Sequence, residues 1–361
     1  MKSSIWLKLS MLFSLICICS LLIVNIQSST AADNGWRPHL WDVFMVSSTD
    51  GWAVGNTGAI IRGYGETWDG GTYSTVTDNN LRGISMVSSN DGWAVGYDGT
   101  ILHWDGSVWS LVTSPTSNDY RSVFMVNAND GWAVGEYKTI IHWDGTSWGR
   151  VESPTVTGYT ELYDVYMVSA NEGWAVGSNG RIFRWDGTSW TNVASPTAET
   201  LESVYMVSSS DGWAVGDGGT ILHWDGTSWS SVASSTSRTL FGVSMVSANE
   251  GWVVGDEVVF YWNGSLWFKP LLADVSGELV SKTHHSVFAL DSDNVYAVGD
   301  FGQVSIFKLP TESNEETILG FSLPMLAVIA GIVVVAVVVI VVVLLLKFKK
   351  LSSETQPSTL E

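Results

Sequence analysis

Apolar residues occur in short runs along most of this chain, and glycine, asparagine and aspartate separate the runs. In one representative stretch, apolar and polar positions alternate over Leu81–Ser88, and a second apolar run follows at Trp93–Gly96. Further runs cover Thr100–Trp104 and Ser107–Val112, and Asp105-Gly106 between them signals a tight hairpin because both turn positions tolerate positive φ. These patterns predict four short β-strands, which we name A to D, in about 40 residues.

This stretch is one copy of a repeat. Its key motif, DGWAVG at Asp91–Gly96, recurs with small changes along the chain and ends in a degenerate NVYAVG copy at Asn294–Gly299. The aromatic residue of the motif lies at Trp52, Trp93, Trp132, Trp174, Trp213, Trp252 and Tyr296. The spacings are 41, 39, 42, 39, 39 and 44 residues, so there are seven copies. Four strands repeated with this period are typical of β-propeller blades.

The sequence therefore predicts an all-β fold, a seven-bladed β-propeller of four-stranded blades over residues 33–309. Large aromatic residues recur at the end of strand C and in strand D, and we expect them to fill the wedges between blades rather than to form a platform for sugars. The strand C set is Trp68, Trp104, Trp143, Trp185, Trp224, Trp262 and Phe307. The strand D set is Tyr73, Trp109, Trp148, Trp190, Trp229 and Trp267.

The seventh copy lacks a strand D. After Phe307 the chain reaches Pro310 and a polar stretch, whereas Asn34–Leu40, at the other end, resembles a strand D with Trp36 in the aromatic position. We therefore expect Asn34–Leu40 to complete the last blade and to close the ring, because an unpaired edge strand is a liability.

The N-terminus has the pattern of a secretory signal. Lys2 and Lys8 precede an apolar run at Met11–Val24, and small residues offer cleavage near Ala31 or Ala32. Residues 1–32 are thus predicted to be a signal peptide. The alternative is an uncleaved N-terminal anchor.

The C-terminus has the pattern of a membrane span. Met325–Leu346 holds 22 residues without a charge, and as a helix it would be about 33 Å long, close to the thickness of the hydrocarbon core. Lys347 and further lysines follow it, which places that side in the cytoplasm. We expect a linker at 310–317, a transmembrane helix at 318–346 and a cytoplasmic tail at 347–361. The chain is thus predicted to be a single-pass cell-membrane protein with an extracytoplasmic propeller.

Charge narrows the choice of partners. The chain has 36 acidic and 17 basic residues and a formal net charge of -19. Such a surface repels nucleic acid, so no nucleic-acid partner is expected. Cys17 and Cys19 are the two cysteines and lie in the first apolar run, so no disulfide is expected in the propeller.

The repeat resembles those of the photosystem II assembly-factor-like and BNR (Asp-box)-like propellers. The likeness rests on the order DGWAVG, GTIL, WDGxxW within Asp91–Trp109, and it covers Trp36 to Leu309. It implies a seven-bladed propeller with a binding or assembly role. The blades have WDGTSW where an Asp-box has Ser-x-Asp-x-Gly-x-Thr-Trp, and Glu66–Tyr73 comes nearer to that motif.

Positions that differ between the copies are the candidates for function, because the blade itself explains the repeated ones. The second residue of strand A is the most varied, and it is expected to open on the channel mouth of the ring. The seven residues are Trp41, Arg82, Arg121, Tyr163, Glu202, Phe241 and His285. We predict that they form a surface for a protein or glycan ligand, with Arg82 and Arg121 engaging an anionic group or an acidic peptide. The alternative is a solvated rim without a ligand.

Metal sites and cofactors are not expected. The acidic residues of the B–C turns lack the ligand alternation of a calcium loop, so a solvated acidic rim is favoured over Ca²⁺ binding. These residues are Asp98, Glu136, Asp217, Asp256, Glu257 and Asp300. His103, His142 and His223 share one repeat position on an outer strand, so they should be dispersed around the ring.

The expected function is a ligand- or protein-binding module, such as a receptor, an adhesion module or an assembly scaffold, and not an enzyme. No catalytic serine, zinc or phosphate-loop motif occurs in the sequence. The alternative is a carbohydrate-active hydrolase that uses Asp42, Asp164 or Glu202 at the channel mouth. A passive surface-layer component is a third possibility. Asn263 lies in a weak glycosylation signal.

Overall fold

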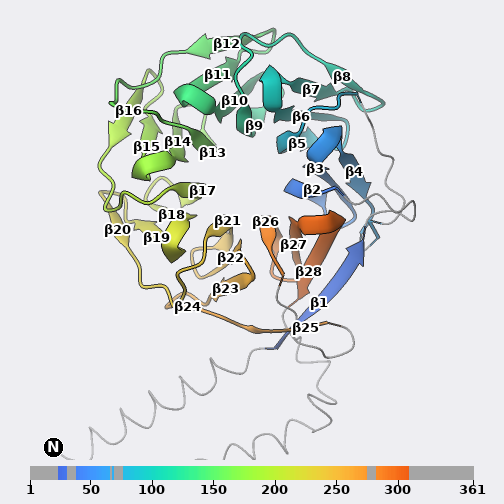
Figure 1. Ribbon diagram of the computed structural model, residues 1–361, viewed down its shortest axis with the longest axis vertical. Coiled ribbons are helices and arrows are strands. Elements are labelled where there is room, and N and C mark those ends of the chain that lie inside the picture. Colours follow the sequence, from blue (N-terminus) through green and yellow to red (C-terminus); the bar gives the residue numbers. More distant parts are fainter. Residues whose placement is uncertain (1–22, 31–37, 66, 69–75, 275–281, 309–361) are drawn as a thin grey trace, which may run out of the picture. The chain divides into compact units, whose positions relative to one another are not determined.

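A computed structural model describes residues 23–30, 38–65, 67–68, 76–274 and 282–308 of the chain. Contacts divide the chain into two compact units, Met1–Leu309 and Pro310–Glu361, and the second lies outside the described residues. The first unit consists of seven β-sheets that follow one another in chain order around a centre, with the first strand of each repeat innermost (Figure 1). The predicted seven-bladed all-β propeller is confirmed.

Blades 1 to 3 are antiparallel sheets whose strands follow the chain from the centre outward. Blade 1 contains β2 (Leu40–Ser47), β3 (Asp50–Gly55) and β4 (Ile60–Gly63). Blade 2 contains β5 (Leu81–Ser88), β6 (Asp91–Gly96), β7 (Ile101–Trp104) and β8 (Trp109–Leu111). Blade 3 contains β9 (Tyr120–Asn127), β10 (Asp130–Gly135), β11 (Thr139–Trp143) and β12 (Trp148–Val151).

Blades 4 to 6 repeat the four-stranded plan of blades 2 and 3, whereas three strands are described for blade 1. Blade 4 contains β13 (Leu162–Ser169), β14 (Glu172–Gly177), β15 (Ile182–Trp185) and β16 (Trp190–Val193). Blade 5 contains β17 (Leu201–Ser208), β18 (Asp211–Gly216), β19 (Ile221–Trp224) and β20 (Trp229–Ser231). Blade 6 contains β21 (Leu240–Ser247), β22 (Glu250–Gly255), β23 (Val258–Trp262) and β24 (Trp267–Phe268).

One-turn 3-10 helices connect the second and third strands of most blades. They are η1 (Asn56–Gly58), η2 (Tyr97–Gly99), η3 (Glu136–Lys138), η4 (Ser178–Gly180), η5 (Asp217–Gly219) and η6 (Asp300–Gly302). The middle residue of each has positive φ, between 53° and 64°, which turns the chain sharply back toward the next strand.

Blade 7 draws on both ends of the ring. It contains β26 (His284–Asp291), β27 (Asn294–Gly299) and β28 (Gln303–Lys308), and then β1 (Ile23–Thr30) and β25 (Leu271–Asp274). β1 pairs antiparallel with β28, from Asn25 opposite Lys308 to Thr30 opposite Gln303. An upstream segment therefore adds a strand to the last blade, as expected.

The identity of that strand differs from the prediction. We expected Asn34–Leu40, but Leu40 begins the inner strand of blade 1, where it pairs with Gly55. The strand that covers the edge of β28 is β1, and Trp36 lies outside the described residues. β1 falls within the predicted signal peptide 1–32, whose cleavage stays a prediction.

Aromatic residues fill the space between neighbouring blades, as predicted. The Trp52 ring, from blade 1, lies 4.9 Å from the Trp104 ring and 5.4 Å from the Trp109 ring of blade 2, measured between centroids. Trp93 packs in the same way on Trp143 and Trp148 of blade 3. Burying a large apolar side chain contributes roughly 1.5–3 kcal/mol. Repetition of this contact is therefore a main source of stability.

The ring is closed by side chains of blades 7 and 1. Tyr296 of β27 lies 6.4 Å from Trp68 between ring centroids, and its hydroxyl donates a hydrogen bond of 2.9 Å to the Ser48 carbonyl. These contacts belong to a core cluster that joins the last blade to the first. The blades of the described part of the chain thus share one continuous series of interfaces.

The glycine of the repeated motif is explained by close packing. A Cβ atom on Gly51 would lie 2.2 Å from the Met45 sulfur of the neighbouring inner strand. The same contact recurs between Gly92 and Met86, at 2.3 Å. Glycine there thus makes room for the end of the methionine side chain, which would have to shift if any other residue took the place of the glycine.

The membrane prediction is not tested by these residues. Within the part of the chain that the structure describes, no helix has the length and apolarity needed to cross a membrane. The predicted transmembrane segment 318–346 lies outside the described residues.

Candidate functional site

A cavity of about 300 Å³ lies where the inner strands of the blades begin. The structure brings all seven predicted mouth residues into its lining, although they are spread over nearly 250 positions of the chain. They are Trp41, Arg82, Arg121, Tyr163, Glu202, Phe241 and His285. The positional part of the prediction is therefore correct, while ligand binding by these residues stays a prediction.

A β-bulge at the start of each inner strand accounts for this convergence. In blade 1, Leu40 pairs with Gly55 and Asp42 pairs with Val54, so Trp41 between them has no partner across the strand. The pairing register skips one residue at the same place in the other blades. Bulges re-aim a side chain away from its regular direction. The repeated bulge thus places one side chain per blade in the cavity lining.

The next residue of two inner strands is an aspartate that joins three blades. Asp42 accepts hydrogen bonds from the Ser286 hydroxyl of blade 7 at 2.7 Å and from the Ile84 amide of blade 2 at 2.9 Å. Asp164 of blade 4 accepts from the hydroxyls of Ser122 at 2.8 Å and Ser203 at 3.0 Å, in blades 3 and 5. Both carboxylates are therefore occupied by structural hydrogen bonds.

Burial makes these two carboxylates weak acids. It raises the pKa of Asp42 to about 7, against the lowering effect of its hydrogen bonds to Ile84 and Ser286. Burial likewise raises the pKa of Asp164. Since their oxygens accept hydrogen bonds from neighbouring blades, the raised pKa values have a structural cause and do not by themselves indicate catalysis.

No carboxylate of the described residues forms an ion pair with Arg82, although Asp119 attracts its charge at longer range. Its guanidinium lies 3.7 Å above the Trp41 ring and 4.9 Å from the Tyr97 ring, and it donates to the Tyr97 hydroxyl. Its Nε atom is buried without a hydrogen-bond partner. Burial, with the repulsion of nearby Arg121, lowers its pKa. A buried donor of this kind favours an incoming anion.

Arg121 differs from Arg82, although the sequence treats the two alike. It forms an ion pair of 2.5 Å with Glu161, which is itself buried and also accepts from the Tyr163 hydroxyl at 3.0 Å. Arg121 also donates to the Tyr97 hydroxyl at 2.8 Å. Its charge is therefore compensated within the protein, which leaves Arg82 as the stronger candidate for an anionic ligand.

Glu202 is the acidic residue among the seven mouth residues. Burial, together with the charge of Asp217, raises its pKa to about 7, while Arg121 and Arg82 act in the opposite direction. The carboxyl group thus keeps its proton to a higher pH than an ordinary glutamate does. It can donate or accept a hydrogen bond there, depending on what enters the cavity.

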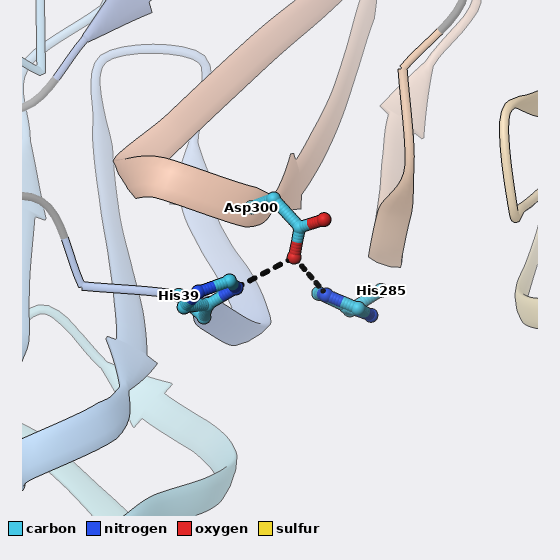
Figure 2. Close-up of side chains that lie close together, drawn as sticks. All are labelled: His39, His285 and Asp300. Atoms are coloured by element: carbon cyan, nitrogen blue, oxygen red, sulfur yellow. Dashed lines mark hydrogen bonds and ion pairs between the residues drawn. The ribbon is translucent and has the colours of Figure 1, made fainter.

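A cluster that the sequence analysis missed lies beside the cavity. His39, just before β2, and His285, in β26, both contact the same oxygen of Asp300 in η6, at 2.6 and 2.8 Å (Figure 2). The three residues occupy three different positions of the repeat, so aligning equivalent positions does not bring them together. The signal that could have revealed the cluster is a combination of three repeat positions. They are the residue before strand A, the second residue of strand A and the first residue of the B–C turn.

The other histidines and acidic turns behave as structural elements. His103, His142 and His223 lie in three different blades, as expected, and each contacts an aspartate of its own blade at 2.8 Å. Among the acidic turn residues, Asp256 and Glu257 pair with Arg238. The solvated acidic rim expected at these turns stays a prediction.

Asn263 has a turn role in the structure. Its side-chain oxygen accepts from the amides of Ser265 and Leu266, both at 3.1 Å. Asp105 holds the equivalent turn of blade 2 in the same way. Glycosylation of Asn263 stays a prediction.

Exposed aromatic residues stand on the turns around the mouth. Phe301 of η6 is 65% exposed, and Tyr137 of η3 and Tyr159 are 58% and 52% exposed. The two tyrosine rings meet edge to face, 5.4 Å apart between centroids. Exposed aromatic side chains on a rim are typical of surfaces that bind other proteins.

Comparison with known proteins identifies the fold. No protein-family model matches the chain. No curated protein matches its sequence. Solved structures do match: YCF48 bound to D1 peptide has a TM-score of 0.64 at 16% identity, covering 79% of this chain and 95% of that one. YCF48 from Cyanidioschyzon merolae has a TM-score of 0.62 at 16% identity, covering 78% and 98%.

WD40 propellers match to a similar extent. The WD40 β-propeller domain of Doa1 has a TM-score of 0.60 at 14% identity, covering 78% of this chain and 96% of that one. These likenesses show the propeller fold. They agree with the resemblance to photosystem II assembly-factor-like propellers at the level of fold, and the resemblance to Asp-box propellers is not confirmed.

Proposed function

We propose that this protein is a non-enzymatic binding scaffold whose mouth cavity receives an anionic group of a protein segment, with Arg82 as the main contact. The observation that carries the proposal is the state of Arg82. It is a cation held between two aromatic rings, with a buried, unpaired Nε donor and no carboxylate partner among the described residues. A guanidinium in this state gains most from a carboxylate or phosphate that accepts two hydrogen bonds.

The size of the cavity favours a small part of a larger ligand. About 300 Å³ is at the lower end of the range of ligand pockets, so it suits one side chain or a chain end. The aromatic residues on the surrounding turns add apolar contact area for the rest of a protein segment. Among the solved structures with this fold, one is YCF48 bound to D1 peptide, which supports a peptide as the class of ligand.

Membrane anchoring is part of the same proposal. It rests on the uncharged segment Met325–Leu346 and on the lysines that follow it. In this arrangement the tail is cytoplasmic and the propeller displays its cavity on the other side of the membrane. A receptor, an adhesion module and an assembly scaffold all fit this arrangement.

The experiment is a peptide array probed with the full-length protein in mild detergent. The array contains peptides with free and with amidated C-termini, and acidic and neutral sequences, and a glycan array serves as the comparison. For the best peptide, Arg82→Gln should weaken affinity at least tenfold, about 1.4 kcal/mol or more. Arg238→Gln is the matched control, because Arg238 is exposed and pairs with Asp256 and Glu257.

Three outcomes can be distinguished. Loss of binding in Arg82→Gln with binding retained in Arg238→Gln supports the mouth cavity as the site. Equal affinity of the wild type and Arg82→Gln for the best peptide contradicts it, and binding to glycans alone points to the other ligand class.

A further inference from the structure

We propose that His39, His285 and Asp300 form a binding site for one divalent transition-metal ion of the zinc class, at the seam where blade 7 meets blade 1. The proposal goes beyond the proposed peptide-binding function and does not depend on it. It rests on the geometry of these three side chains and on the repeat positions that they occupy.

The three potential ligand atoms converge on one point. Nδ1 of His39 lies 2.6 Å and Nε2 of His285 lies 2.8 Å from the same Oδ1 atom of Asp300, and all three ligand atoms lie within 4.8 Å of one another. Figure 2 shows both imidazoles directed at the carboxylate, whose second oxygen points away from them. Three side chains from three segments of the chain thus face one another.

The fold brings the same three repeat positions together at other seams. The residue that precedes strand A contacts the first residue of the B–C turn in the preceding blade. For example, the Thr239 hydroxyl, just ahead of blade 6, donates a hydrogen bond of 2.8 Å to Asp217 in blade 5. The second residue of strand A meets the turn of its own blade, as when Trp41 donates to Asn56. His39, His285 and Asp300 occupy these positions at the seam between blades 7 and 1.

At each of the other six seams, at least one of the three equivalent residues has a side chain that does not suit a metal site. The interfering residues are Trp41, Arg82, Arg121, Tyr163, Thr239 and Phe241. Two imidazoles and a carboxylate therefore occur together at one of seven equivalent places. Among the residues that the structure describes, this cluster also meets the geometric requirement for holding a metal ion.

The donor set selects the kind of metal. Two imidazole nitrogens and one carboxylate oxygen suit zinc and its neighbours in the transition series, whereas Ca²⁺ and Mg²⁺ prefer oxygen ligands. Ligands about 2.0–2.2 Å from a tetrahedral zinc ion are about 3.3–3.5 Å apart from one another. The observed distances of 2.6 and 2.8 Å need to open by less than about 1 Å, which side-chain rotation can supply. A water molecule completes four-coordination.

The surroundings allow an ion to enter and to be held. The side chains of His39 and Asp300 are 38% and 34% exposed, so the site is open to solvent. The Trp41 ring lies 4.2 Å from the His285 ring, and Phe301 lies 5.1 Å from His39, between centroids. The Arg82 guanidinium also packs on the Trp41 ring, 3.7 Å from its centroid. The aromatic wall holds both imidazoles in place.

A metal ion here would link the first blade of the ring to the last. His39 leads into the first blade, whereas His285 and Asp300 belong to the last one, so coordination would join the two ends of the repeat array. Because the ion binds the folded ring and not the open one, saturating metal should raise the melting temperature by several degrees. His285 also lines the mouth cavity, so the ion would fix one wall of the proposed binding site.

The experiment uses the full-length protein in mild detergent, stripped with a chelator and then titrated with Zn²⁺ by calorimetry and with Co²⁺ by visible absorption. We expect one Zn²⁺ per chain and a Co²⁺ spectrum of the tetrahedral type. His39→Gln, His285→Gln and Asp300→Asn should each weaken Zn²⁺ binding at least tenfold, and each should abolish the metal-dependent rise in melting temperature. Circular dichroism of each variant without metal checks that it is folded.

His223→Gln is the matched control, because His223 forms a similar 2.8 Å contact with Asp211 but has no third potential ligand in the part of the chain that the structure describes. It should bind Zn²⁺ as the wild type does. The proposal is overturned if the wild type binds no Zn²⁺ at concentrations up to about 100 μM, since the cluster is then a hydrogen-bond network only. It is also overturned if the double variant His39→Gln/His285→Gln, shown to be folded, keeps the wild-type affinity.

Discussion

The Asp42 carboxylate accepts a hydrogen bond of 2.7 Å from the Ser286 hydroxyl, 244 positions away in the sequence. This contact joins the first blade to the last. The same carboxylate accepts from the Ile84 amide of the second blade, so one side chain holds three blades together beneath the mouth cavity. Asp164 does the same for blades 3, 4 and 5.

Truncating this aspartate should destabilise the ring. Asp42→Ala leaves the Ile84 amide and the Ser286 hydroxyl without an acceptor, and each buried unsatisfied group costs about 1–3 kcal/mol. We expect a loss of about 2–4 kcal/mol in the free energy of unfolding, measured by urea denaturation. Asp98→Asn, on an exposed turn, is the control and should change stability by no more than about 0.5 kcal/mol. A stable Asp42→Ala protein would show that this contact does not hold the ring.

The contribution of Asp42 to the stability of the protein should fall as pH rises from about 4 to 7. Burial raises the pKa of Asp42 from its ordinary value of 3.8 to about 7, so in this window the folded chain binds more protons than the unfolded chain. As the pH rises, Asp42 of the folded chain loses its proton, and the stabilisation that comes from its protonated form is lost. This loss is complete above pH 7. Melting curves of the wild type and Asp42→Asn across this range test the effect. Relative to the variant, the wild type should lose stability as the pH rises, and parallel profiles would argue against the raised pKa.

Affinity for an anionic peptide should depend on Glu202. Burial and the charge of Asp217 raise the pKa of Glu202 to about 7, against the opposing effect of Arg121 and Arg82, and Glu161 adds to the rise. A peptide carboxylate near Arg82 is repelled by ionised Glu202, so binding should be about threefold to tenfold tighter at pH 6 than at pH 8. The measurement is calorimetry with a histidine-free acetylated peptide. Glu202→Gln should bind at pH 8 as tightly as the wild type binds at pH 6, and a variant that keeps the wild-type pH dependence would refute this role.

Removing one tryptophan side chain from between two blades should lower the free energy of unfolding more than a surface substitution does. Trp93 is buried and lies 4.7 Å from the Trp143 ring and 5.4 Å from the Trp148 ring of the next blade. Trp93→Ala should lower the free energy of unfolding by about 3–5 kcal/mol, measured by denaturant unfolding. Leu111→Ala is the control, because Leu111 is 61% exposed and should contribute less than about 0.5 kcal/mol. Equal losses of unfolding free energy in the two variants would mean that the tryptophans between the blades are not a main source of stability.

The sequence predicted the blade number and the mouth residues because both follow from the repeat. A spacing of about 40 residues between equivalent tryptophans fixes the number of blades. The position of Trp41 or Arg82 in its copy was enough to place it at the mouth. The bulge that directs these side chains was not visible in the sequence, since it depends on the pairing register between two strands.

Contacts between residues of different repeat copies cannot be read from the sequence. Arg82 and Arg121 occupy the same repeat position, and they differ because Glu161, from the blade after that of Arg121, pairs with only one of them. The closing strand was misassigned because two segments near the N-terminus have strand-like patterns, and only backbone pairing distinguishes them. The signal peptide and the membrane helix stay predictions.

The most direct test of the mouth cavity as the binding site is hydrogen–deuterium exchange of the full-length protein with and without the best peptide from the array. Our account predicts protection at the starts of β2, β5 and β9 and in η2, which surround Arg82, with no change at the β7–β8 hairpin on the opposite face. Protection confined to that hairpin or to its equivalents in other blades would contradict the account.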